Sequence, residues 1–230
     1  MFQPGEVLSY PAICAYEGTA LQRGMNFRLR SGRSVILMSV RRGAPYADHI
    51  DEDGRILIYE GHDVPRLKNG PHPKSVDQPR AHSGGRLTQN GLFEEVAKRY
   101  KEGLGPAEKV TVYEKIRAGI WVYNGVFELV DSWQEKNATR RVFKFRLRLI
   151  DDPVYEASPN HELEHIRLIP SEVKRAVWKR DRGKCVTCGA TDNLHFDHVI
   201  PYSKGGSSLV AENIQLLCLR HNLSKHDRIE

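Results

Sequence analysis

Two metal-chelating pairs lie near the C-terminus of this 230-residue chain. Cys185 and Cys188 are separated by two residues, and so are Cys218 and His221. Zinc in proteins prefers four sulfur or nitrogen ligands in a tetrahedron, and two pairs of this spacing supply them without strain. Cys185 and Cys188 are too close in sequence for a typical structural disulfide, so a disulfide framework is the poorer interpretation. A complete set of four ligands leaves no position for water, and we therefore expect a structural zinc ion.

The charge and hydropathy of the chain limit its class without deciding its function. The formal net charge of +6 is compatible with a polyanionic partner but does not prove one. No apolar run is long enough to span a bilayer, and the start of the sequence lacks the basic and apolar regions of a secretory signal. We therefore expect a cytoplasmic protein without a membrane partner, long enough for one large or two small domains.

The first 150 residues are predicted to be rich in β-strands. Period-two alternation is clearest over 142–149, where apolar residues share one face and basic residues share the other, which we expect to be solvated. The basic residues are Lys144, Arg146 and Arg148. Further strands are predicted at 35–40, 55–59, 109–113 and 120–123, with one helix at 90–100 after a long loop, Pro65–Gly85. Short strands with one helix predict a curved sheet or a small open barrel.

The sequence predicts an α+β chain of two domains. Residues 151–170 contain three prolines among mixed polar residues and are interpreted as a linker. Residues 1–150 then form one domain and residues 171–230 another. Ser171 is expected to cap a helix over 171–180, because a serine hydroxyl at this position can accept a backbone N–H.

A second group of residues lies between and after the chelating pairs. It runs in order through Asp197-His198 with Pro201, then Gly205-Gly206, then Asn213 ahead of Leu217-Cys218, and then Asn222 ahead of Lys225. This block, over residues 172–230, closely resembles the HNH (ββα-metal) nuclease family. The resemblance implies a ββα-metal domain that hydrolyses phosphodiester bonds with one divalent metal ion.

The resemblance also implies a role for each residue of the block. His198 is expected to be the general base, since a neutral imidazole near pH 7 can take a proton from water. Asp197 and Asn222 are expected to bind the catalytic ion, Mg²⁺ or Mn²⁺, which prefers oxygen ligands. Asn213 is expected to pin the loop that orients His198. Many relatives have histidine in the last motif position, so His226, one helical turn beyond Asn222, is the alternative metal ligand.

A shorter pattern stands in the N-terminal half. Tyr46, Asp48 and Asp51 are followed by a strand that ends in Tyr59-Glu60-Gly61. With the apolar and aromatic segments 110–113, 121–130 and 143–147, this pattern resembles the SRA (YDG) family, a PUA-like fold that flips modified cytosine out of DNA. The resemblance implies that Tyr46 and Tyr59 enclose the flipped base and that Asp48 accepts from its amino group. One residue is inserted relative to the family pattern, so Asp51 is an alternative to Asp48.

Together, the two resemblances predict a modification-dependent restriction endonuclease that cuts double-stranded DNA carrying 5-methylcytosine or a related base. Arg41, Arg42 and Lys225 are expected to contact the DNA, because cations supply most of the affinity for its backbone. Cutting both strands with one metal site per chain implies a homodimer. Two alternatives stay open: an HNH nuclease that reads or nicks unmodified DNA, and a DNA reader without catalytic activity.

Overall fold

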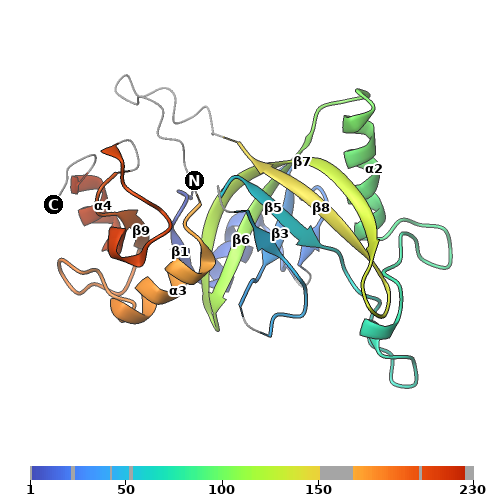
Figure 1. Ribbon diagram of the computed structural model, residues 1–230, viewed down its shortest axis with the longest axis horizontal. Helices are drawn as coiled ribbons and strands as arrows, with labels where there is room; N and C mark the ends of the chain where they lie inside the picture. The colour runs from blue at the N-terminus through green and yellow to red at the C-terminus, as the bar shows by residue number, and fades with distance from the viewer. Residues whose placement is uncertain are drawn as a thin grey trace.

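The computed structural model describes the whole chain except residues 1, 22–23, 42, 52–53, 151–167, 202–203 and 226–230. A large curved sheet lies beside a smaller lobe that contains α3, β9, β10 and α4 (Figure 1). The predicted α+β class with a curved N-terminal sheet is confirmed. Most of the predicted linker, 151–167, lies outside the described residues, so the domain boundaries stay a prediction. None of the described helices is long and apolar enough to cross a membrane.

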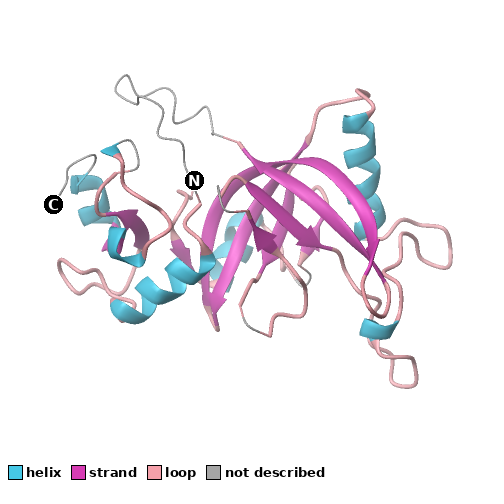
Figure 2. Ribbon diagram, viewed as in Figure 1, coloured by secondary structure: helices cyan, strands magenta, loops and turns pink. Residues whose placement is uncertain are grey.

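Eight strands form the large sheet in the order β2-β3-β6-β7-β8-β5-β4, with β1 paired to β7. β3 and β6 run parallel, and the other neighbouring strands are antiparallel (Figure 2). The strands are β1 (Val7–Leu8), β2 (Met25–Asn26), β3 (Ser34–Met38), β4 (His49–Ile50), β5 (Ile56–Glu60), β6 (Glu108–Arg117), β7 (Ile120–Lys136) and β8 (Arg141–Leu149). The strands predicted from the sequence overlap β3, β5, β6, β7 and β8.

The sheet bends where β6 and β7 depart from regular pairing. Their register shifts between Val112 and Tyr113, and β7 shifts against β8 between Leu129 and Asp131. Gly125 lies opposite Val112 and has a φ of +100°, which a residue with a Cβ rarely adopts. Bulges of this kind increase local twist, so the 17-residue β7 can follow both neighbours around the curve.

The main hydrophobic core lies between the sheet and α2 (Gln89–Lys101). Thr88 begins this helix by accepting a backbone N–H from Gly91 at 3.3 Å. Phe93 and Ala97 of α2 are fully buried, as is Phe145 of β8. Burying a large apolar side chain of this kind contributes about 1.5–3 kcal/mol, so this face of α2 stabilises the curved sheet.

The structure contains elements that the sequence patterns do not indicate. α1 (Tyr10–Glu17) begins at Ser9, whose hydroxyl accepts from the Ala12 N–H, and ends at Gly18 with a φ of +68°. Its pattern is weak because only Ile13 and Glu17 are buried. Short strands such as β1, β2 and β4 are also absent from the prediction, since two residues are too few to show alternation.

Two expectations about single side chains are corrected. Pro170, rather than Ser171, is the N-cap of α3 (Ser171–Arg180), and no side chain caps this helix. Ser171 is the first helical residue and is buried. The alternation predicts a solvated Lys144, but this side chain is buried because its ammonium pairs with Glu60 at 3.1 Å. Arg146 and Arg148 are exposed, as predicted.

The smaller lobe is built on the antiparallel pair β9 (Leu194–His198) and β10 (Ile214–Cys218), which leads directly into α4 (Leu219–Lys225). α3 is fastened to this pair by Arg180, which donates to the carbonyl oxygens of Ala211 and Ile214, both at 2.6 Å. Two strands followed by a helix form the ββα arrangement that the sequence predicts.

The smaller lobe packs directly on the hairpin formed by β6 and β7. Ile116 and Val122 of the hairpin share a hydrophobic cluster with Val173 and Val177 of α3 and with Phe196 of β9. This cluster fixes the orientation of the small lobe through apolar packing as well as through the continuity of the chain.

Polar contacts strengthen the same junction. Lys174 of α3 is 1% exposed and donates to Glu114 Oε2 at 2.8 Å and to Asn124 Oδ1 at 2.7 Å. Burial alone would raise the pKa of Glu114, but the Lys174 ammonium lowers it below the ordinary value. A Cβ on Gly5 would lie 2.7 Å from Phe196 O, so only glycine permits the close crossing of the N-terminal segment over β9.

Candidate functional site

The four predicted chelating side chains converge in the small lobe. The ligand atoms of Cys185, Cys188, Cys218 and His221 all lie within 4.8 Å of one another. The sulfurs of Cys188 and Cys218 are 3.8 Å apart, and His221 Nδ1 lies 3.4 Å from Cys185 Sγ and 3.3 Å from Cys218 Sγ. Ligands of a tetrahedral zinc ion lie about 3.6 to 3.8 Å apart, given the usual zinc–sulfur and zinc–nitrogen bond lengths. The donor set and its spacing therefore fit zinc.

The environment of Cys185 favours the ionised thiol that zinc requires. Burial alone would raise the pKa of this thiol, but hydrogen bonds from the backbone at Cys218, Cys188 and Thr187 lower it to about 6. Zinc binds the thiolate, and binding releases the proton of the thiol. A thiol that ionises below neutral pH is thus suited to a metal ligand.

Asp197 and His198 lie at the end of β9, where the chain enters the loop between β9 and β10. His198 Nε2 is 2.8 Å from the hydroxyl oxygen of Ser208, which is buried. Burial also lowers the pKa of His198 below its usual value of 6.5. The imidazole is therefore mostly neutral near pH 7, which is the state that can accept a proton from water.

Asn213 ties together the loop that follows His198. Its Oδ1 accepts from Ile200 N at 2.8 Å, and its Nδ2 donates to Ile200 O and Ser207 O, both at 3.0 Å. A Cβ on Gly206 would lie only 1.8 Å from Ile200 O, so glycine allows the loop to fold this tightly. These contacts hold the loop two residues beyond His198, and the positioning role of Asn213 stays a prediction.

Lys225 occupies an unexpected position at the end of α4. Its side chain is 1% exposed, its Nζ lies 2.8 Å from Asp197 Oδ2, and it also donates to the carbonyl oxygen of His198. The predicted DNA contact does not fit this geometry, because the ammonium is buried against the carboxylate. Asn222 lies one turn earlier on the same face of α4. His226 lies outside the described residues.

Near the predicted base pocket, the ring that lies parallel to Tyr46 is that of His62. Tyr46 lies parallel to His62, with ring centroids 6.4 Å apart and an interplanar angle of 18°. The Lys74 ammonium stands 4.1 Å from the centroid of the Tyr46 ring. Tyr59 is 1% exposed and belongs to the main hydrophobic core. Among the three rings, Tyr46 and His62 therefore form the parallel pair.

Asp48 and Asp51 occupy different environments. Asp48 is buried and accepts from the backbone N–H groups of Glu60 at 3.0 Å and Ser39 at 3.3 Å. Burial raises the pKa of Asp48 to about 7 in spite of these hydrogen bonds. Asp51 instead accepts from two backbone N–H groups at the start of β5, at 3.0 and 3.1 Å. Asp48 thus binds the end of β5, just before the segment that carries His62, whereas Asp51 closes the turn before β5.

Ion pairs join the end of β5 and the segment that follows it to β8 and its neighbouring residues. Lys144 pairs with Glu60 at 3.1 Å, while Asp63 pairs with both Arg140 at 2.5 Å and Lys74 at 2.9 Å. Arg140 is only 2% exposed. Because buried charges are tolerated only when paired, this network holds the segment after β5 in a defined position.

Sequence patterns gave no signal for three of these residues. His62, Lys74 and Ser208 belong to no motif, and each is brought to its partner by the fold. Of the remaining predicted DNA contacts, Arg41 is exposed and forms no ion pair with the described residues. Arg42 lies outside them.

The small lobe, with its chelating cluster and its Asp197-His198 pair, corresponds to a known family. Residues 185–228 match the HNH endonuclease family. The match includes β9, β10 and α4, so the chelating cluster, Asn213 and His198 all belong to one HNH domain. A metal-dependent endonuclease activity follows for this domain. No curated protein sequence matches the chain.

Solved structures similar to the chain include a DNA reader and two restriction enzymes. The SRA domain of SUVH5 in complex with fully methylated CG DNA is 22% identical with a TM-score of 0.44, covering 64% of this chain and 89% of that one. The modification-dependent restriction endonuclease TagI is 20% identical with a TM-score of 0.42, covering 96% and 76%. The Type IV phosphorothioation-dependent restriction endonuclease ScoMcrA is 17% identical with a TM-score of 0.45, covering 99% and 53%.

Proposed function

We propose that this protein is a modification-dependent DNA endonuclease, in which the sheet reads a modified cytosine and the HNH domain hydrolyses the DNA backbone. The observation that carries the proposal is the position of His198 and Asp197 at the end of β9. The loop beyond them is held by Asn213, within a segment that matches the HNH family. Two such chains, each cutting one strand, would make the double-strand break.

His198 acts as the general base of the proposed reaction. Its buried imidazole is neutral near pH 7 and takes a proton from the attacking water. Asn213 keeps the adjoining loop in place, so that the imidazole faces the scissile phosphate. Asp197 and Asn222 supply the oxygen ligands that Mg²⁺ or Mn²⁺ prefers. The bound ion supplies charge stabilisation for the phosphate and the leaving oxygen.

The base pocket is proposed to use Tyr46 and His62 as its two faces. Their parallel rings are 6.4 Å apart, close to the roughly 6.8 Å that two stacking steps of about 3.4 Å require. Asp48 is the proposed acceptor for the cytosine amino group, since each carboxylate oxygen retains a lone pair beyond its backbone hydrogen bond. Tyr59 then supports the pocket from the hydrophobic core.

Cleavage of two matched plasmids tests the proposal. One plasmid is fully methylated at cytosine and the other is unmodified, and each is incubated with Mg²⁺ or Mn²⁺ and the wild type or His198→Ala. We expect cleavage of the methylated plasmid alone and none by the variant. Equal cleavage of both plasmids would leave the nuclease intact and reject the modified-base pocket. No cleavage of either plasmid, with DNA binding retained, would favour a non-catalytic reader.

A second pair of variants tests the faces of the pocket. His62→Ala removes one proposed stacking surface, and it should weaken binding to methylated duplex by about tenfold, as expected for one lost stacking contact. Tyr59→Phe removes only a hydroxyl from a core residue and should leave the preference for methylated DNA unchanged. The opposite ranking of the two variants would restore Tyr59 as the second face.

A further inference from the structure

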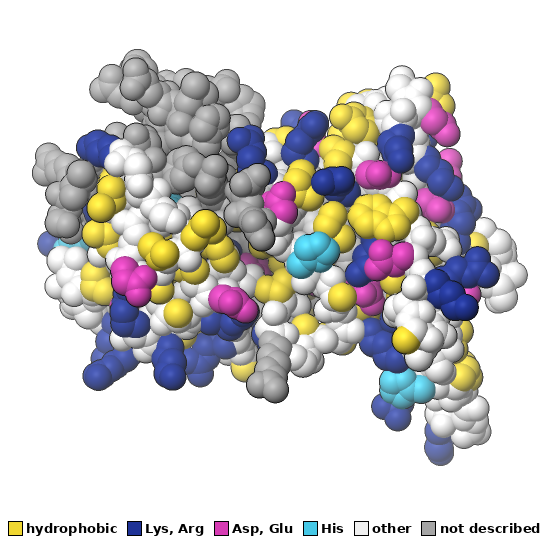
Figure 3. Space-filling view, viewed as in Figure 1, with side chains coloured by type: hydrophobic (Ala, Val, Ile, Leu, Met, Phe, Trp, Pro, Cys, Tyr) yellow, Lys and Arg dark blue, Asp and Glu magenta, His cyan; other side chains and the backbone are white. Residues whose placement is uncertain are grey.

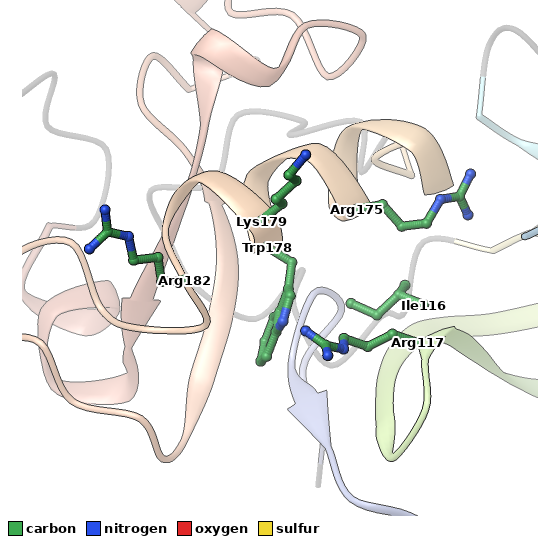
Figure 4. Close-up of a pocket in the computed structure, with 6 residues that line it drawn as sticks. All are labelled: Ile116, Arg117, Arg175, Trp178, Lys179 and Arg182. Carbon is green, nitrogen blue, oxygen red and sulfur yellow. The ribbon is translucent and has the colours of Figure 1, made fainter.

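Four cationic side chains surround a pocket where α3 meets the hairpin of β6 and β7. The pocket has a volume of about 420 Å³ (Figure 4). Its lining residues are Ile116, Arg117, Arg175, Trp178, Lys179 and Arg182. Figure 3 shows Lys and Arg side chains gathered along the lower edge of the small lobe, below α3. We call Arg117, Arg175, Lys179 and Arg182 the cationic strip.

The cations of α3 fall into two groups. Lys174 and Arg180 are bound to acidic or carbonyl partners that join α3 to the hairpin and to β10. Arg175 and Lys179 are four residues apart and lie on one side of α3, while Arg182 follows in the turn after the helix, with a φ of +57°. None of the strip residues forms an ion pair with the part of the chain that the structure describes.

An uncompensated row of like charges is costly to the folded protein. Arg175 and Lys179 are neighbours at a spacing of four residues, and like charges at this spacing destabilise a helix. The buried Nη1 of Arg175 has no hydrogen-bond partner among the residues that the structure describes. A buried donor without a partner is costly to the folded state, and a change of side-chain conformation that exposes it to an anion would remove that cost. Both features point to an anionic ligand.

The directions of the side chains indicate the shape of that ligand. In Figure 4, Arg175 and Arg182 extend in opposite directions from α3, and Arg117 lies across from them on the hairpin. A single phosphate ion would require cations that converge on one point. Arg175 and Lys179 are about 6 Å apart along the axis of α3, Arg182 lies beyond the end of the helix, and each DNA strand carries one charge for every 3.4 Å or so of helix axis. The spread of charge therefore matches an extended backbone.

We propose that the cationic strip binds the sugar-phosphate backbone of duplex DNA, at a site separate from both the base pocket and His198. The proposal rests on DNA as the substrate of the proposed function. α3 is fixed both to the sheet, through Lys174 and Glu114, and to the HNH hairpin, through Arg180. A DNA backbone bound along α3 would therefore keep a constant position relative to the sheet, which is proposed to read the base, and to the HNH hairpin, which is proposed to cut.

Salt-dependent DNA binding tests the strip. The variant is Lys179→Gln/Arg182→Gln, since both side chains are exposed and neither forms an ion pair or a hydrogen bond with the described residues. The matched control, Arg99→Gln/Lys109→Gln, removes two exposed charges that form no ion pair with the described residues, one on α2 and one near the start of β6. Binding of wild type and variants to methylated and unmethylated duplex is measured by fluorescence anisotropy without divalent metal, over a range of NaCl concentrations.

Loss of two phosphate contacts should lower the slope of log K against log salt by about two and weaken binding by about tenfold. Both duplexes should be affected equally, because a backbone contact does not read the base. Arg117→Gln, on β6 rather than on the α3 side of the pocket, should lower the slope of log K against log salt by about one. The control variant should behave as wild type.

A strip variant with the slope and affinity of the wild type would overturn the proposal, as would an equal loss in the control. Inorganic phosphate that displaces DNA at constant ionic strength, in the wild type but not in the strip variant, would identify a single-anion site instead. If wild type cuts methylated plasmid while the strip variant binds normally, only the strip is rejected. If the strip effect is present but both plasmids are cut alike, only the modified-base pocket is rejected. A wild type that does not bind duplex DNA would reject both.

Discussion

The Lys225 ammonium lies 2.8 Å from the carboxylate oxygen Oδ2 of Asp197 and is almost completely buried. The same ammonium donates to the carbonyl oxygen of His198. A positive charge of the protein therefore already neutralises the carboxylate that is proposed to hold the catalytic metal ion. Metal binding at Asp197 must take place against the repulsion of this neighbouring charge.

Lys225→Met should bind Mn²⁺ more tightly than the wild type. The substitution keeps the length of the side chain and removes the charge that repels the ion, and we expect about a tenfold or greater gain in affinity. Isothermal titration calorimetry with Mn²⁺ on the zinc-loaded protein measures this directly. Lys109→Met, which removes an exposed lysine of β6, serves as the control. Unchanged Mn²⁺ affinity of Lys225→Met would mean that the metal does not bind beside Asp197.

Loss of the chelating cluster should destabilise the HNH domain. Cys188 is exposed, so Cys188→Ser changes the ligand without disturbing the packing of the core. We expect release of one zinc ion per chain and a fall in melting temperature of about 10 °C or more, since zinc binding contributes folding free energy. Cys14→Ser, a change of a cysteine outside the cluster, should retain zinc. Equal zinc content in both variants would argue against the site.

The buried pair of Lys174 and Glu114 should couple the two lobes energetically. Lys174→Met leaves the fully buried Glu114 without its cation and should lower the free energy of unfolding by about 3–5 kcal/mol near neutral pH. Lys174→Met/Glu114→Gln should recover much of this loss, because no charge then remains unpaired. Urea unfolding of the wild type, both single variants and the double variant gives the coupling. Additive effects of the two substitutions would show that the pair contributes nothing beyond its separate side chains.

The buried Asp48 should make stability depend on pH. Its pKa is raised from 3.8 to about 7, so the folded state binds the proton more tightly than the unfolded state. The stabilisation is therefore fullest in acid and is lost as the pH rises from about 4 through 7. Between pH 5 and pH 8, the wild type should lose about 2–3 kcal/mol relative to Asp48→Asn.

Urea unfolding of the wild type and Asp48→Asn at several pH values measures this difference. Asp51→Asn provides the control, because Asp51 closes a turn and lies outside the buried network. Its difference from the wild type should not change with pH in this way. A constant difference between wild type and Asp48→Asn would show that Asp48 is ionised throughout the range.

The C-terminal lobe could be predicted in detail because its information is local. A CxxC pair and a CxxH pair place ligands at adjacent positions of a turn and a helix start, and the intervening hairpin brings the pairs together. Period-two alternation likewise located the long strands of the sheet, but it failed for Lys144. Alternation predicts which face of the sheet a side chain occupies, but it does not predict whether that face is solvated. Lys144 is buried on the predicted face because Glu60 on the neighbouring strand forms an ion pair with it.

The sequence by itself determined the chelating cluster and the strand-rich character of the N-terminal half, because each follows from spacing within a short segment, and the ββα order of the HNH domain was implied by the family resemblance of its motifs. Only the tertiary structure decided that Lys225 faces Asp197, that His62 rather than Tyr59 lies parallel to Tyr46, and that Lys174 joins the lobes through Glu114. These contacts join residues on separate elements, and their geometry depends on how the sheet curves and how α3 packs against it. No periodicity within one segment carries that information.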